Sequence, residues 1–587
     1  MSTSFSPAEA HLEKWRTLLL ASLDVTAAPA IDAHAADAGL YRWFPEYSIN
    51  VYGNLITRHL PLWADKRCLK TFDAAGNYTA YTYGEVDSLV RVVAATLDLP
   101  PQGKLAVIGG PTIETAVLVL ASAFLGCHHT VVIPALPQDS VVARLDLFDP
   151  DIVVVPTSST FTQDKTSRHV RVATLKITGT DVWFDDGLCA NDAARGRQPR
   201  SYRASDNLLT LFTSGSTGFP KGIVHGPTGF MLFAHYTSNY FFGLSSDSTM
   251  LCGASSGWIN GHTYSIYAPL LHGATSVLVE EPTRLSMIGS LTAIMATAEP
   301  SILYLPVTTV RILRSISALS SPPNLVPPLE SIGTMGEMLA PSTEAWFTDF
   351  FSGGRLPVVN TYFQTETGGV LCAKRFNQSP GISEGEIGPL PWFATITDDD
   401  DDGVLVLKDP VPGFMVDILS PDRDTQLQKY FPSGAYCLHD YGCLEDGTLF
   451  CSGRSDDIVN VRGVRLASGE IESHVLSIPD VVECAAVEYR NAMELTDMRI
   501  FAVLSDSTRM ADEAYRFELL SQLTLLLKDT VSEQASPGSI VFVESLPKTI
   551  SGKILRRLLR YVELPATAER MIVTLPESVD MTILGSV

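Results

Sequence analysis

The residues from Thr210 to His225, TLFTSGSTGFPKGIVH, concentrate groups that can hold an anion. Hydroxyls, glycines and one lysine stand together at Thr213, Ser214, Gly215, Ser216, Thr217, Gly218 and Lys221. Hydroxyl and backbone N–H groups donate hydrogen bonds to phosphate oxygens, and glycines let the backbone approach closely. The segment is not a Walker A loop, because Pro220 precedes the lysine and Gly222 stands where that motif carries a magnesium-binding hydroxyl. It predicts a phosphate-binding loop of another kind.

Strand-like apolar runs alternate with helical segments along the chain before this loop. The run 105–110 precedes an amphipathic helical segment at 114–126, and strands alternate with a helix again up to residue 156. Such alternation predicts βαβ units, in which helices cover parallel sheets. The loop itself follows a strand-like run at 206–212. The predicted fold class is therefore α/β, and a strand is expected to present the loop.

The chain is too long for a single hydrophobic core, since 587 residues exceed the usual ceiling of about 300. Residues 449–473 bring glycines, charges and short strands together, and beyond residue 478 short strands alternate with a helix near 514–528. We predict a large N-terminal domain, 1–455, that contains the parallel sheets. A smaller α+β C-terminal domain, 456–587, follows it.

The charge balance limits the classes of partner. The formal net charge is −23 at pH 7, so the chain repels nucleic-acid backbones and anionic membranes at long range. We expect neither of these as a partner, and an anionic substrate must meet a locally basic or amide-rich site. Nine cysteines without a CxxC pair fit reduced thiols, and no apolar run near the start is long enough for a bilayer. These features predict a cytoplasmic protein.

The segment TSGSTGFPKG resembles the phosphate loop of the adenylate-forming superfamily, which includes acyl-CoA synthetases, luciferases and nonribosomal adenylation domains. Further motifs follow in the order of that superfamily: GWINGH (257–262), TMGEM (334–338), TYFQTETGG (361–369), the Asp440 region, the 449–473 segment and PKTISGKILRR (547–557). The GWxxGH motif, the aromatic pair before QTETGG and the segment 43–59 resemble the acetyl-CoA synthetase branch. The resemblance implies a short-chain acyl-CoA synthetase with a mobile C-terminal domain.

The resemblance implies a reaction in two halves, with ATP, Mg²⁺ and coenzyme A as the small molecules involved. A carboxylate attacks the α-phosphate of ATP, and the coenzyme A thiol then attacks the acyl adenylate. The 213–218 hydroxyls and amides would surround the β- and γ-phosphates with Lys221 nearby. Thr365 would donate to the α-phosphate, and Glu366 would hold Mg²⁺, which prefers oxygen ligands.

The resemblance also implies a nucleoside site. The adenosine would lie between Gly336-Glu337 and the face of Tyr362, because an aromatic face offers stacking area to a planar base. Asp440 would accept hydrogen bonds from both ribose hydroxyls, and Arg454 would also reach the ribose. Met338 departs from the pattern, since the superfamily usually has proline after the Gly-Glu pair.

The resemblance implies that residues of the C-terminal motifs move between the two half-reactions. Lys553 would enter between the carboxylate and the α-phosphate, and Asp456 would be the hinge about which the domain turns. Gly463 would then border the pantetheine passage, where a side chain would block the thiol. Arg465 would meet the phosphate side, and Arg144 is a candidate for the nucleotide of coenzyme A.

Four positions resemble the acetyl pocket of the acetyl-CoA synthetase branch: Ile259, Asn260, Met335 and Phe363. Phe363 stands where that branch has tryptophan, so the pocket gains space on the order of two or three methylenes, each worth about 0.8 kcal/mol. Met335, in place of valine, takes some of that space back, and Asn260 adds an amide that needs a partner. We predict a preference for C3 to C5 acids, branched or bearing one oxygen, over acetate.

Two further hypotheses stay open at this point. An adenylating ligase could pass its acyl group to a carrier protein instead of coenzyme A, and no carrier domain is evident in the chain. A degenerate nucleotide-binding relative is the other alternative, although Lys221, Thr365, Glu366, Asp440 and Lys553 are all present. The sequence identifies neither the acid nor the oligomeric state.

Overall fold

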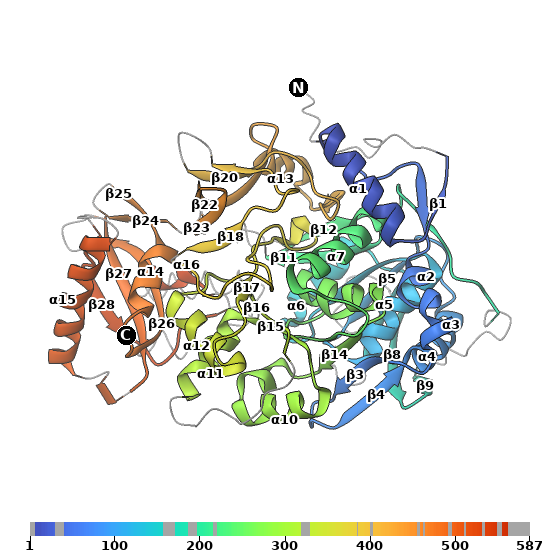
Figure 1. Cartoon of the computed structure of the whole chain (residues 1–587), viewed down its shortest axis with the longest axis horizontal. Helices are drawn as coiled ribbons and strands as arrows, with labels where there is room; N and C mark the ends of the chain where they lie inside the picture. Colours follow the sequence, from blue (N-terminus) through green and yellow to red (C-terminus); the bar gives the residue numbers. More distant parts are fainter. Residues whose placement is uncertain are drawn as a thin grey trace.

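The computed structural model describes residues 6–29, 40–156, 171–185, 196–214, 220–317, 329–383, 385–398, 403–454, 458–461, 464–490, 496–506, 508–509, 512–530, 535–548 and 554–560. Two large sheets with their helices form most of the molecule (Figure 1). The elements from α14 (Ser468–Leu476) onward, coloured orange to red, lie together at one end of it.

The first large sheet has eight strands in the order β21–β12–β11–β6–β5–β7–β8–β9. They are β5 (Lys104–Ile108), β6 (His128–Val132), β7 (Ile152–Pro156), β8 (Arg171–Thr178), β9 (Asp181–Phe184), β11 (Leu209–Ser214), β12 (Pro220–His225) and β21 (Asp417–Leu419). The neighbours from β11 to β8 are parallel, and α5 (Ile113–Leu125) and α6 (Gln138–Phe148) connect strands of this group. The predicted βαβ alternation and the α/β class are confirmed.

The residues that flank helix α5 set where it begins and ends. The Thr112 side chain accepts a hydrogen bond from the Thr115 N–H, and Gly126 ends the helix at φ 72°, which glycine adopts without steric cost. The sequence predicts an amphipathic helix here, but every residue of α5 except Glu114 is buried. The reason is that α5 packs against the sheet on one face and against α4 (Tyr83–Leu97) on another.

The second large sheet has seven strands in the order β17–β16–β15–β13–β14–β3–β4. They are β3 (Arg67–Phe72), β4 (Tyr78–Thr82), β13 (Thr249–Cys252), β14 (Thr275–Val279), β15 (Ile302–Pro306), β16 (Ser331–Met335) and β17 (Val358–Asn360). All neighbouring pairs except β3 with β4 are parallel. The carboxyl ends of these strands therefore meet at one edge, which is where ligands bind in parallel sheets.

Helices and two smaller sheets complete the N-terminal part. The helices are α1 (Glu9–Ser22), α2 (Val51–Leu55), α3 (Leu60–Trp63), α7 (Pro227–Phe242), α8 (Ile259–Gly261), α9 (Ala268–Leu271), α10 (Ile288–Ala298), α11 (Val307–Ser317), α12 (Pro341–Ser352) and α13 (Arg423–Tyr430). The five-stranded antiparallel sheet contains β18 (Glu386–Pro389), β19 (Ile396–Asp398), β20 (Val404–Leu407), β22 (Tyr436–Glu445) and β23 (Thr448–Arg454). A three-stranded sheet contains β1 (Val25–Ala27), β2 (Tyr47–Ile49) and β10 (Tyr202–Arg203).

The C-terminal elements enclose hydrophobic clusters of their own. A sheet contains β26 (Val481–Arg490), β27 (Thr496–Leu504) and β28 (Ser539–Phe542), beside the hairpin of β24 (Ile458–Val461) and β25 (Val464–Ala467). Helices α14, α15 (Glu513–Thr530) and α16 (Arg556–Leu559) complete this part. Its two clusters of buried side chains draw only on residues between Val459 and Leu559. The predicted boundary residue, Asp456, lies outside the described residues.

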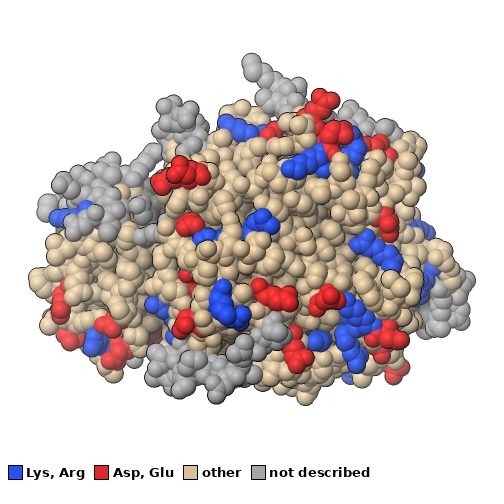
Figure 2. Space-filling model, viewed as in Figure 1, with Lys and Arg blue, Asp and Glu red and all other residues tan. Residues whose placement is uncertain are grey.

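Charged side chains of both signs are mixed over the face shown in Figure 2, and the blue basic residues do not gather into a patch on it. Among the described residues, no helix combines the length and the apolar character that crossing a membrane requires.

Candidate active site

The phosphate loop predicted from the sequence connects two antiparallel strands, β11 and β12. Thr213 lies opposite Lys221 in this hairpin, and Ser214 is the last residue of β11. The Thr213 hydroxyl is buried and has no hydrogen-bond partner among the described residues, so it is a donor available beside the loop. Gly215, Ser216, Thr217 and Gly218 lie outside the described residues.

A tyrosine joins the hairpin to the TET motif. The Tyr430 hydroxyl accepts a hydrogen bond from Lys221 Nζ at 3.2 Å and donates one to Glu366 Oε1. Lys221 Nζ also lies 5.0 Å from the centre of the Tyr430 ring and 3.4 Å from Gln426 Oε1. Both partners come from α13, about 200 residues further along the chain. The predicted lysine and the predicted glutamate are therefore linked through one side chain.

The TET motif forms a short 3₁₀ turn, Thr365–Thr367, that the neighbouring side chains hold in place. The Thr367 hydroxyl accepts a hydrogen bond from the Gln364 N–H at 3.1 Å and contacts the Gln364 carbonyl at 2.9 Å. Glu366 is buried, at 8% exposure, and its carbonyl accepts from the Met415 N–H at 2.8 Å. Thr365 is partly exposed.

The predicted nucleoside residues meet around Asp440 in β22. Asp440 Oδ2 accepts hydrogen bonds from the Tyr362 hydroxyl at 2.5 Å and from Gln364 Nε2 at 3.1 Å. Asp440 is 6% exposed and Tyr362 is 8% exposed. Arg454 lies opposite Asp440 in the pairing of β22 with β23, although its side chain is outside the described residues. The tyrosine, the aspartate and the backbone of the arginine are therefore neighbours.

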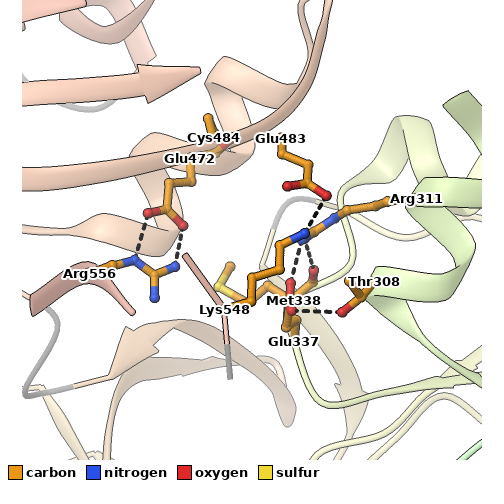
Figure 3. Close-up of polar contacts among 9 residues, drawn as sticks. All are labelled: Thr308, Arg311, Glu337, Met338, Glu472, Glu483, Cys484, Lys548 and Arg556. Atoms are coloured by element: carbon orange, nitrogen blue, oxygen red, sulfur yellow. Dashed lines mark hydrogen bonds and ion pairs between the residues drawn. The ribbon is translucent and has the colours of Figure 1, made fainter. Parts of the chain in front are cut away.

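The Gly336-Glu337 pair follows β16, and its two residues have different surroundings. Gly336 takes φ +92°, and a Cβ placed on it would have open space around it. The Glu337 carboxylate turns the other way, toward α11, where it pairs with Arg311 and accepts from the Thr308 hydroxyl at 3.1 Å (Figure 3). Arg311 also donates to the Met338 carbonyl at 3.0 Å. The backbone of Gly336, and not the Glu337 carboxylate, is thus left free to face a base.

The four residues predicted to contact the acid occupy the edge where β13, β16 and β17 end. Ile259 and Asn260 begin α8, and each is 2% exposed. Met335 ends β16 at 4% exposure, and Phe363 follows β17 and is only partly buried against the main hydrophobic cluster. Three of these four side chains are apolar, and Asn260 contributes an amide.

Two buried histidines, His262 and His225, are neutral near pH 7. His262 of the GWINGH motif contacts His129 through their Nε2 atoms at 3.0 Å, and its Nδ1 lies 3.0 Å from the Ser256 carbonyl. Burial lowers the pKa of His262 to about 4, and it also lowers the pKa of His225 to about 4. Neither ring therefore adds a positive charge near pH 7.

Comparison with family models covers both parts of the chain. Residues 57–416 match the AMP-binding enzyme family, and residues 470–553 match the AMP-binding enzyme C-terminal domain. The chain belongs to the AMP-binding enzymes. It is an AMP-forming acid–thiol ligase of the acyl-CoA synthetase type, for which ATP and coenzyme A are substrates. The resemblance read from the motifs is confirmed, as is the presence of a separate C-terminal domain.

Relatives of this AMP-binding enzyme are similar over most of their length. The acetyl-coenzyme A synthetase of Pasteurella multocida (strain Pm70) is 31% identical in an alignment 572 positions long, which covers 90% of this chain and 86% of the relative. The acetyl-coenzyme A synthetase of Xanthomonas oryzae pv. oryzae (strain MAFF 311018) is 30% identical in an alignment 576 positions long, which covers 90% of this chain and 87% of the relative.

Solved structures share the fold. Acetoacetyl-CoA synthetase from Streptomyces lividans superimposes with a TM-score of 0.79 at 19% identity, covering 97% of this chain and 91% of that one. A benzoate CoA ligase from Burkholderia xenovorans LB400 gives a TM-score of 0.70 at 21% identity, covering 87% of this chain and 99% of that one.

Several C-terminal residues of the predicted site of this AMP-binding enzyme lie beyond the described residues, namely Asp456, Gly463 and Lys553. Arg465 lies in β25, where its backbone is paired with Asn460, and its side chain is not described. Arg144 is 3% exposed and donates to the Ser140 carbonyl at 3.0 Å within α6. The roles of these five residues stay predictions.

The sequence did not point to all of the polar groups that organise the site. Gln364 lies inside a recognised motif, but its bonds to Asp440 and to the Leu438 carbonyl were not anticipated. Tyr430 has no motif around it, and only its aromatic hydroxyl within a polar helix could have drawn attention. Tyr304 and Thr361 lie in or beside buried strands, where they resemble core residues.

Proposed function

We propose that this enzyme is a short-chain acyl-CoA synthetase that joins C3 to C5 acids to coenzyme A through an acyl adenylate, in preference to acetate. The observation that carries the proposal is the linked row from Lys221 through Tyr430 to Glu366, which sets the phosphate hairpin beside the TET turn. Phosphoryl transfer depends on positioned donors and charges more than on covalent work by side chains. A prearranged row of this kind supports that chemistry.

In the first half-reaction, protein donors would stabilise charge on the phosphoryl oxygens as pyrophosphate leaves. Thr213, with the loop after it, would bind the β- and γ-phosphates, and the partly exposed Thr365 would donate to the α-phosphate. Asp440 would accept from the ribose hydroxyls, and Tyr362 would stack on the base. Lys553 would approach the bond that forms between the acid and the α-phosphate.

The donor set fits a magnesium ion at Glu366. This carboxylate is buried, its described partner is the neutral Tyr430 hydroxyl, and among the described residues no cation forms an ion pair with it. A buried negative charge without a counter-charge is costly, and Mg²⁺ prefers carboxylate and phosphate oxygens. Glu366 would hold the ion, which supplies charge neutralisation at the phosphates.

In the second half-reaction, the C-terminal domain would turn about Asp456 and bring Gly463 to the pantetheine passage. Arg465 would then lie on the phosphate side, and Arg144 is the candidate for the nucleotide of coenzyme A. Gly469 of α14 supports close approach of the two domains, because a Cβ placed on it would lie 2.8 Å from Met338 Sδ. The two parts of the chain therefore already touch beside the nucleoside site.

The predicted preference for C3 to C5 acids depends on the size of residue 363. Phe363 is partly exposed at the edge where Met335 also ends its strand, so a larger ring at 363 would reduce the space there. The related enzymes named acetyl-coenzyme A synthetase share about 30% identity, which leaves room for a different acid.

The test measures pyrophosphate exchange and AMP release over straight, branched and hydroxylated C2 to C8 acids, with and without coenzyme A. We expect exchange to be strongest with C3 to C5 acids and AMP release to require coenzyme A. Gly463→Leu should keep the exchange and lose acyl-CoA formation, because its side chain would obstruct the thiol. Pyrophosphate exchange without coenzyme A-dependent AMP release would instead indicate a carrier protein as the acceptor. The greatest activity on acetate would refute the preference for C3 to C5 acids.

A further inference from the structure

A row of three hydrogen bonds runs behind the acid side of the site. Asn260 lies 2.6 Å from the Tyr304 hydroxyl, which lies 2.7 Å from the Thr361 hydroxyl. The Thr361 hydroxyl in turn lies 2.8 Å from the Thr334 carbonyl. All four residues are buried. We call them the Asn260–Thr334 row.

The Thr334 end determines the direction of every bond in the row. Two oxygens 2.8 Å apart need a proton between them, and a carbonyl has none, so the Thr361 hydroxyl donates to Thr334. With that proton committed, Tyr304 must donate to Thr361. Tyr304 then has only an acceptor left for Asn260, which must present its NH₂ group. The orientation of the Asn260 amide is therefore fixed by its neighbours.

This orientation leaves one acceptor unmatched. Asn260 Oδ1 is buried and has no hydrogen-bond partner among the described residues. A buried acceptor without a donor lowers stability or binding, because the group has lost its water and gained nothing in exchange. A molecule that binds at the site can supply the missing donor.

Asn260 lies beside residues that we propose to contact the acid. Asn260 directly follows Ile259, and the row ties it to Thr361, two residues before Phe363. No described carboxylate bonds to Asn260, Tyr304 or Thr361, so a buried ammonium group would lack a counter-charge here. A neutral donor satisfies the oxygen without that cost.

We propose that the acid used by this enzyme carries a hydroxyl group, which donates to Asn260 Oδ1. The inference rests on the proposed acyl-CoA synthetase function and on the place of Asn260 beside the acid. Its substrate class is the short hydroxy acids of three to five carbons. A site built to pair a hydroxyl disfavours the analogue that lacks it, because the oxygen then stays unmatched.

The experiment compares each alkanoic acid with its hydroxy isomers in coenzyme A-dependent AMP release. Propionate is paired with 2- and 3-hydroxypropionate, and butyrate with 2-, 3- and 4-hydroxybutyrate. In the wild-type enzyme, at least one hydroxy acid should exceed its parent by about 10-fold or more in kcat/KM. Asn260→Leu should bring the ratio of kcat/KM for the hydroxy acid to kcat/KM for its parent acid close to one. Asn239→Leu, which replaces an exposed asparagine of α7, should keep it.

The outcomes separate the two proposals. If neither the parent acids nor the hydroxy acids release AMP, the proposed function is wrong. If the parent acids are used and no hydroxy acid is preferred, Asn260 Oδ1 binds water or stays unmatched, and this inference alone is overturned. An unchanged preference in Asn260→Leu would overturn it as well. Should that variant not fold, the wild-type ratios alone decide.

Discussion

The nucleotide side and the acid side of the site differ in how their polar groups are matched. On the nucleotide side, the carboxylates of Asp440 and Glu366 each accept hydrogen bonds from neighbouring protein groups. On the proposed acid side, Ile259, Met335 and Phe363 are apolar and Asn260 Oδ1 has no partner among the described residues. We propose that the first side binds the nucleotide, which every reaction shares, and that the second distinguishes one acid from another. Changes on the first side should lower turnover of all acids alike, whereas changes on the second should alter their ranking.

The largest effect is expected for Lys553→Ala. Loss of one positioned donor should slow adenylation by about 10² to 10³-fold for every acid tested, as followed by pyrophosphate exchange. Thioester formation from supplied acyl adenylate should survive, because Lys553 is proposed to be withdrawn in that half-reaction. Lys548→Ala removes a nearby lysine that pairs with Glu483 and should have little effect (Figure 3). Equal loss in both half-reactions, or a loss that depends on the acid, would contradict the assignment.

Asp440→Asn should raise the KM for ATP by about 10- to 10²-fold, because a hydrogen bond to a charged acceptor is worth about 1.5–3 kcal/mol. The order of preference among acids should stay the same. Initial rates over a range of ATP concentrations with two acids provide the measurement. Asp480→Asn, at an exposed pair with Arg509, is the control. A changed acid ranking in Asp440→Asn would show that the two sides are not independent.

Phe363→Trp tests the acid side. The larger ring should shift the ratio of kcat/KM toward acetate by about 10-fold or more, which corresponds to about 1.4 kcal/mol. The KM for ATP should change little. Phe517→Trp makes the same replacement at an exposed position of α15 and should leave the ratio unchanged. An unaltered acid profile in Phe363→Trp would remove residue 363 from the pocket.

The smallest effect is expected for Tyr430→Phe, which keeps the ring beside Lys221 and removes the hydroxyl between Lys221 and Glu366. A net hydrogen bond is worth about 0.5–1.5 kcal/mol, so kcat/KM should fall about 2- to 10-fold for all acids equally. Tyr515→Phe, which removes a hydroxyl bonded to Asp480 far from the site, provides the comparison. A fall confined to one acid would place Tyr430 on the acid side instead.

The sequence predicted the features that short segments determine. The βαβ order and the motifs of the site follow from local composition, and the structure places Lys221, Glu366, Tyr362 and Asp440 in two linked groups. Contacts between distant segments could not be read in this way. Tyr430 reaches Lys221 from about 200 residues away, and the Glu337 carboxylate turns to Arg311 because α11 lies beside it.

Burial was a second limit on prediction. The sequence pattern of residues 114–126 does not show whether one face of the helix is buried or several faces are. The answer depends on whether α4 packs over the helix. Asn260 could be recognised as an amide in need of a partner, yet which of its atoms is matched depends on the hydroxyls of two other strands.

The Asn260–Thr334 row has a polarity, and the hydroxyl of Thr361 decides it. In Thr361→Val the Tyr304 proton loses its acceptor and turns to Asn260 Oδ1, so the amide rotates and directs its NH₂ group toward the acid. A site that accepts a hydrogen bond from its substrate becomes one that donates a hydrogen bond, and oxo acids should then replace hydroxy acids as the better substrates. On this proposal Thr361, which is two hydrogen bonds away from Asn260, influences the choice of acid. Exchange of its hydroxyl for a methyl group is expected to reverse that choice.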